Sequence, residues 1–178
     1  MMHVMLDLET LSTRSNAIIL SIGAVAFDPV KDIIGDSYYA NLDIDLQKAV
    51  SGHICEDTLR WWMAQGDEAR KRAFAGGDTH GALHSFKEWS GSLGTPKDDL
   101  KVWGNGAAFD NAILSSLYSR INMQSPWHFY NDRCYRTIKA LRPDIKLVRV
   151  GVHHDPRDDA ESQARHLIKI LQAMNVSG

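Results

Sequence analysis

The chain has 178 residues, enough for one compact domain with a sizeable core, so we expect a single domain over residues 1–178. With 44% hydrophobic and 24% charged residues, its composition is that of an ordinary soluble globular protein. The formal net charge of −2 gives no strongly basic field that would indicate nucleic-acid binding. A bound divalent metal would nevertheless reverse the potential at an acidic site.

The sequence gives no indication of secretion or of a membrane. The first residues lack the basic segment and long apolar core of a signal peptide, and no apolar run approaches the roughly 20 residues that span a bilayer. Cys55 and Cys134 lie far apart, without the spacing of a zinc site, and fit a reducing compartment. We expect a cytoplasmic protein that does not enter a membrane.

The first part of the chain predicts three strands. Residues 3–8 form a buried strand, residues 18–29 form an apolar run that ends in an Asp-Pro pair, and residues 33–42 form the third strand. Their short connections favour an antiparallel meander.

The rest of the chain is mainly helical. A short strand over 100–104 interrupts it and returns to the sheet, which predicts one α/β domain. The expected helices are those between residues 44 and 93, with starts at Asp57, Asp67 and Asp78, and those over 108–122, 131–141 and 155–175.

Asp7 and Glu9 lie two positions apart in the first predicted strand. Strand side chains alternate between faces, so both carboxylates share one face, roughly 6–7 Å apart. Their charges repel each other unless a positive group lies between them. A strand end that turns into solvent is the structural alternative.

Asp110 lies on the apolar face of the helix predicted over 108–122. A carboxylate at this position must be paired, neutralised or bound to metal, because an isolated buried charge is costly. The apolar residues of that face, at offsets of 3, 4, 7 and 11 from Asp110, are Ile113, Leu114, Leu117 and Ile121.

A third acidic region precedes and opens the last helix. Asp159 lies roughly 100° from the centre of the helix's apolar face and Asp158 roughly 160°, so Asp159 borders the buried face and Asp158 faces solvent. His154, just before the helix, can lean over the same site. We therefore favour His154 and Asp159 over His153 and Asp158. The apolar face consists of Ala160, Ala164, Leu167, Leu171 and Met174.

The three regions together predict a metal site. Four carboxylates without thiolates suit two divalent ions, Mg²⁺ or Mn²⁺, better than zinc. Such a pair, about 3.5–4 Å apart, can clamp the attacking and leaving oxygens of a phosphoryl displacement. A histidine beside it can act as the base, since its ordinary pKa is near 6.5.

These residues resemble the DEDDh group of 3′–5′ exonucleases, in the ribonuclease H-like superfamily. DLET at 7–10 resembles the first exonuclease motif, NGAAFD at 105–110 the second, and His154 with Asp159 the third. The resemblance runs from about residue 2 to 172. TLRWWMAQG at 58–66 is similar to a small stand-alone prokaryotic branch, described as exoribonucleases or as exodeoxyribonuclease VIII-like proteins.

The resemblance implies a mixed sheet, with an antiparallel three-strand meander plus parallel strands, flanked by helices. It implies hydrolysis of terminal phosphodiesters at 3′ ends of single-stranded DNA or RNA, releasing 5′-mononucleotides, and a homodimer as a further expectation. Asp7 would bridge two metals, Glu9 and Asp159 would help hold the ion with the nucleophilic water, Asp110 would reach the other, and His154 would be the general base.

Two other functions are kept open. One is a non-catalytic nucleic-acid-binding or regulatory module of the same fold, against which the intact carboxylate set argues. The other is an unrelated metal hydrolase that acts on small phosphoesters.

Five residues are candidates for touching the nucleotide. Leu11 would lie under the terminal base, where relatives often continue as D-x-E-T-T-G. Adjacent helix residues point about 100° apart, so at most one of Trp61 and Trp62 reaches the site while the other packs in the core. Phe109 either packs or lines the pocket, and Asn105 either donates to substrate or braces its loop. The five candidates are Thr10, Leu11, Asn105, Phe109 and Trp61.

Overall fold

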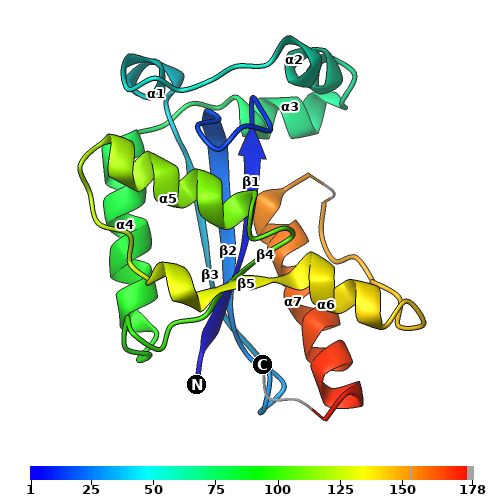
Figure 1. Cartoon of the computed structure of the whole chain (residues 1–178). Coiled ribbons are helices and arrows are strands. Elements are labelled where there is room, and N and C mark those ends of the chain that lie inside the picture. Colours follow the sequence, from blue (N-terminus) through cyan, green and yellow to red (C-terminus); the bar gives the residue numbers. More distant parts are fainter. Residues whose placement is uncertain (153, 176–178) are drawn as a thin grey trace.

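The first three strands form the antiparallel meander that the sequence predicts. In the computed structural model, which describes residues 1–152 and 154–175, they extend into a five-stranded mixed sheet of order β3-β2-β1-β4-β5 (Figure 1). β4 pairs parallel with β1, and β5 parallel with β4. The strands are β1 (His3–Thr10), β2 (Ile19–Asp28), β3 (Ile33–Asn41), β4 (Val102–Gly104) and β5 (Asp132–Cys134).

Helices cover both faces of this sheet, with α4 and α5 on one face and α6 and α7 on the other (Figure 1). Alternation along β1 explains the two layers: Val4, Leu6 and Leu8 pack with α4 and α5, whereas Met5 packs with α7. The helices are α1 (Ile44–Ala49), α2 (Glu56–Met63), α3 (Asp67–Ala73), α4 (Thr79–Ser92), α5 (Asp110–Arg120), α6 (Tyr135–Leu141) and α7 (Pro156–Ala173).

The short helices α2 and α3 lie beyond the C-terminal end of β1 (Figure 1). A separate apolar cluster attaches them there, in which Trp62 of α2 and Ala73 of α3 pack with Leu11 and Ile18. Trp62 also donates its indole N–H to the carbonyl of Thr10, at 2.9 Å. The end of β1 is thus covered by a cap of helices.

One predicted helix boundary is wrong. Residues 131–134 were expected to open a helix, but Phe129–Asn131 form a 3₁₀ turn and the next three residues form β5. Side-chain hydrogen bonds stabilise this conformation: the side-chain amide of Asn111 and the indole of Trp127 both donate to Asp132 Oδ1, at 2.9 and 2.7 Å. A three-residue strand is too short to show a period of two.

Two further findings concern the membrane and the cysteines in the described residues. None of their helices is both long and apolar enough to cross a membrane. Cys55 and Cys134 are free thiols.

Candidate active site

Asp7 and Glu9 lie on the face of β1 that α7 covers. The side-chain amide of Gln163, on α7, donates to Asp7 Oδ1 at 2.7 Å, and Glu9 is buried. The N-terminus of α7 can approach because β2 has Gly23 opposite Asp7. A Cβ at Gly23 would lie 2.1 Å from the carbonyl carbon of Pro156. The strand thus holds the two acids directly under the start of the helix.

Asp110 approaches the same acids from the N-terminus of α5. It is 3% exposed, and its Oδ1 accepts the backbone N–H of Leu8 at 3.3 Å. Its Oδ2 is buried and has no hydrogen-bond partner among the described residues. A Cβ at Gly104 would lie 3.0 Å from this oxygen, so glycine leaves the room that the carboxylate needs.

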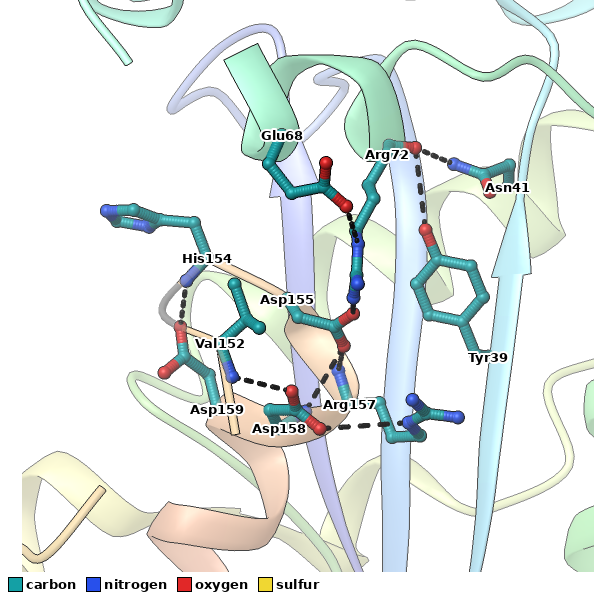
Figure 2. Close-up of polar contacts among 10 residues, drawn as sticks. All are labelled: Tyr39, Asn41, Glu68, Arg72, Val152, His154, Asp155, Arg157, Asp158 and Asp159. Atoms are coloured by element: carbon teal, nitrogen blue, oxygen red, sulfur yellow. Dashed lines mark hydrogen bonds and ion pairs between the residues drawn. The ribbon is translucent and has the colours of Figure 1, made fainter. Parts of the chain in front are cut away.

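Asp159 enters from the first turn of α7. Its Oδ1 accepts from Arg149 at 2.6 Å, and its Oδ2 accepts the backbone N–H of His154 at 3.1 Å. The neighbouring Asp158 is more exposed, at 19% of its side chain, and its Oδ2 accepts the backbone N–H of Val152 at 2.7 Å (Figure 2). Asp158 closes the preceding loop, while Asp159 faces the acids.

His154 completes the cluster from the residue before the N-cap of α7. Its backbone has a positive φ of 65°, and its Nδ1 lies 3.9 Å from Glu9 Oε1. Its ring meets the ring of Trp61 edge-on, with centroids 5.1 Å apart. Glu9, His154 and Asp159 each offer a ligand atom, and these atoms all lie within 4.8 Å of one another. His153, the disfavoured histidine, lies outside the described residues.

Burial raises the pKa values of three acids of the cluster, and for Glu9 and Asp7 the neighbouring carboxylates add to the shift. Burial, reinforced by Asp159 and Asp110, raises the pKa of Glu9 to about 8. Burial also raises the pKa of Asp110 to about 7. The pKa of Asp7 is raised as well, mainly by burial and then by repulsion from Asp110 and Glu9. Each shift disfavours negative charge, so the cluster gains from any cation placed in it.

The donor set fits a hard divalent metal. It offers carboxylate oxygens and one imidazole, with no thiolate, which is the chemistry that Mg²⁺ and Mn²⁺ prefer. The unpartnered Oδ2 of Asp110 is a buried acceptor of the kind that a cation satisfies. The raised pKa values of the acids point the same way, because a bound cation reverses them.

Two cavities adjoin at this site. One, of about 270 Å³, is lined by acids of the cluster and by Asn105, Arg149 and Gln163. The other, of about 390 Å³, shares Leu8 and Glu9 with the first and is lined mainly by aromatic and polar side chains. The residues of this second cavity, called here the aromatic pocket, are Leu8, Glu9, Thr10, Thr13, Asp57, Thr58, Trp61 and Phe109.

The structure places four of the five nucleotide-contact candidates at the cavities. Trp61 is 43% exposed at the aromatic pocket, and Trp62 is 1% exposed in the core, as the spacing of the pair predicts. Leu11 is the exception and that prediction is wrong. It is 1% exposed, because the chain turns after β1 and directs this side chain into the cluster beneath α2 and α3.

Two residues at the acid cluster, Gln163 and Arg149, are not among those predicted from the sequence. Gln163 follows Asp159 by four positions, so helical spacing places both on one face of α7 and could have indicated its role. Arg149 lies in an irregular segment before α7, where no periodic pattern exists to position it. Its approach to Asp159 is a purely tertiary contact.

Comparisons with known proteins show the family of this chain. The model of the 3′-5′ exoribonuclease Rv2179c-like domain matches residues 2–171. An exodeoxyribonuclease of Enterobacteria phage T4 is 26% identical over 165 residues, covering 79% of this chain and 72% of the phage protein.

Solved structures show the same fold. The nuclease domain of 3′hExo, a DEDDh family member bound to rAMP, aligns with a TM-score of 0.66 at 14% identity, over 97% of this chain and 92% of that one. E. coli exonuclease I with a dT13 oligonucleotide aligns with a TM-score of 0.61 at 14% identity, over 99% and 41%. The expected ribonuclease H-like α/β fold is confirmed. The chain belongs to the Rv2179c-like 3′-5′ exoribonuclease domain family and is a 3′–5′ exonuclease with the fold of the DEDDh group.

Proposed function

We propose that this enzyme removes nucleotides one at a time from the 3′ end of single-stranded RNA or DNA, using two divalent ions and His154 as the general base. The observation that carries the proposal is the position of Glu9, which lines both the acid cavity and the aromatic pocket. A terminal nucleotide in the aromatic pocket would present its phosphate to the acids.

Asp7, Glu9, Asp110 and Asp159 would hold the two ions, either Mg²⁺ or Mn²⁺. When bound, the ions supply positive charge that stabilises the attacking and leaving oxygens of the phosphodiester. The four carboxylates supply the oxygen ligands, and Gln163 fixes the orientation of Asp7 through its hydrogen bond.

His154 would accept the proton of the attacking water. Attack on the terminal phosphorus breaks its bond to the 3′ oxygen of the preceding nucleotide, which releases a 5′-mononucleotide and a chain one residue shorter. The leaving oxygen takes a proton from solvent. The His154 side chain is 26% exposed, so it can return its own proton to bulk water after each cycle.

The aromatic pocket suits one unpaired nucleotide. Trp61 and Phe109 offer ring faces or edges for a base, and stacking of this kind tolerates any sequence. A pocket that encloses a terminal base leaves no room for its pairing partner, which is why single-stranded or frayed ends are the proposed substrate.

The description of the matched family favours RNA, while the phage T4 relative is an exodeoxyribonuclease. We take RNA as the first substrate to test and DNA as the direct comparison. The homodimer, the cytoplasmic location and the single domain over the whole chain stay predictions.

The test uses matched single-stranded RNA and DNA oligomers labelled at the 5′ end, with Mg²⁺ or Mn²⁺. We expect a ladder that shortens by one nucleotide per step, that disappears with chelator, and that is suppressed in Asp7→Asn and His154→Ala proteins that remain folded. Internal fragments would contradict the proposal. Failure to cleave either oligomer would also contradict it. Binding without cleavage would favour a nucleic-acid-binding module, and hydrolysis of only a small p-nitrophenyl phosphoester would favour an unrelated metal hydrolase.

A further inference from the structure

A buried carboxylate joins the start of α7 to the helical cap. Asp155, the N-cap of α7, is 3% exposed. Its Oδ1 accepts the backbone N–H groups of Arg157 and Asp158, at 3.1 and 3.3 Å. Its Oδ2 pairs with Arg72 of α3, 83 residues earlier in the chain, at 2.5 Å (Figure 2).

Arg72 is itself fixed at both ends. Its Nε donates to Glu68 Oε1 at 3.1 Å, one turn earlier on α3. Its backbone carbonyl accepts the side-chain amide of Asn41, at the end of β3, at 2.7 Å. These contacts hold the guanidinium toward Asp155 (Figure 2). The residues that make them line a cavity of about 410 Å³.

The two ends of this ion pair lead to the active site by different routes. Asp155 follows His154 directly, and its carbonyl accepts the backbone N–H of Asp159 at 2.9 Å. Arg72 belongs to the cap that carries Trp61, because Ala73 of α3 and Trp62 of α2 share one apolar cluster. Trp61 in turn meets the ring of His154.

The segment before α7 is held by individual contacts, several of them to α7 itself. Among the described residues between the end of α6 at Leu141 and the start of α7 at Pro156, none is helical or extended. The position of His154 therefore depends on the contacts at the N-terminus of α7. The ion pair of Arg72 with Asp155 joins this N-terminus to α3, as the ring contact of Trp61 with His154 joins it to α2.

We propose that Arg72 is a positioning residue: its ion pair with Asp155 fixes the start of α7, and with it His154 and Asp159, against the helices that carry Trp61. The expected effect of Arg72 on kcat rests on the proposed function. The structural consequence, an ordered segment before α7, can be measured without any substrate.

The control must remove a similar ion pair that lies within one helix and does not link two elements. Arg165 of α7 pairs with Glu161 of the same helix at 2.7 Å, and both side chains lie partly exposed on its surface. Arg165→Gln is therefore the matched control for Arg72→Gln. Arg72→Lys keeps the charge without the planar guanidinium and should restore part of the function.

The experiment measures amide hydrogen exchange in peptides that cover residues 144–160, together with kcat and KM on a single-stranded oligomer. Arg72→Gln should increase exchange in this segment and lower kcat roughly ten- to a hundredfold, since small displacements of catalytic groups have effects of this size. KM should change little, Arg72→Lys should be intermediate, and Arg165→Gln should match wild type.

Equal exchange and equal kcat in the Arg72→Gln and Arg165→Gln proteins would overturn the proposal. If Arg72→Gln fails to fold, Asp155→Asn serves instead, because asparagine still accepts the cap bonds but lacks the charge. Should wild type itself cleave no oligomer, the proposed function fails, while the exchange comparison still decides whether Arg72 orders the segment.

Discussion

The amide of Gln163 donates to Asp7 Oδ1 at 2.7 Å, across 156 residues of sequence. This bond joins the central strand β1 to α7, the helix that contributes Asp159. It also holds one of two acidic oxygens of Asp7 in a fixed direction. An acid so oriented is prepared to bind a metal without first losing rotational freedom.

Replacing Gln163 with alanine should therefore weaken metal binding. Loss of such an orienting partner commonly lowers metal affinity or activity about 10- to 100-fold. The change is measured by Mn²⁺ titration of both activity and melting temperature. Gln172→Ala, an exposed glutamine near the end of the same helix, is the control. An unchanged Mn²⁺ midpoint in Gln163→Ala would show that the bond does not prepare the site.

The raised pKa values of the acids predict an unusual pH dependence of stability. The pKa of Glu9 is about 8 in the folded protein and that of Asp110 about 7, because burial disfavours their charge. In the unfolded chain both ionise near pH 4. Between pH 6.5 and 8 the metal-free folded protein thus binds more protons than the unfolded chain, and its free energy of unfolding falls as the pH rises.

Thermal unfolding in chelator over this pH window measures the effect. His3 opposes it only below pH 6.5, since burial lowers the pKa of that imidazole to about 4. Saturating Mg²⁺ should remove the loss, because the ion binds the ionised carboxylates. Glu9→Gln should reduce the slope. A melting temperature that rises with pH in chelator would contradict the assigned shifts.

Arg149 should compete with a bound metal ion for Asp159. Its guanidinium bonds to Asp159 Oδ1 at 2.6 Å, so a metal that uses this oxygen must displace it. The arginine side chain is half exposed, and such pairs contribute up to about 1 kcal/mol, so Arg149→Ala should tighten Mg²⁺ binding about two- to fivefold. Calorimetric titration measures this, with Arg142→Ala as control, since Arg142 pairs with Asp144. Weaker binding would instead mean that Arg149 holds Asp159 in its liganding orientation.

Features carried by many residues of regular period could be predicted from the sequence. Alternation along β1 separates Val4 and Leu6 from Met5 and Asp7, and the structure has the same separation. Helical spacing also distinguishes buried Trp62 from exposed Trp61. The three acidic regions were found because each places a carboxylate against an apolar pattern, where charge is costly unless it is compensated.

Features that depend on single tertiary contacts could not be predicted. β5 has three residues and is stabilised by bonds from Asn111 and Trp127 to Asp132. Arg72 reaches Asp155 across 83 residues, with nothing in either local pattern to pair them. Leu11 was misplaced because the turn after β1 changes its direction, which strand alternation alone does not describe.

The adjacent tryptophans of α2 should respond to substitution in opposite ways. Trp61 is 43% exposed at the aromatic pocket, so Trp61→Ala should leave the melting temperature almost unchanged and weaken oligomer binding by about 1–3 kcal/mol, the value of one base–aromatic stack. Trp62 is 1% exposed and bonds to Thr10, so Trp62→Ala should lower the free energy of unfolding by about 3–5 kcal/mol. Fluorescence anisotropy with a labelled oligomer, in Ca²⁺ to suppress turnover, and urea unfolding measure the two effects. Each variant is the control for the other: equal losses of stability would show that Trp61 is a packing residue and that the pocket does not stack a base on it.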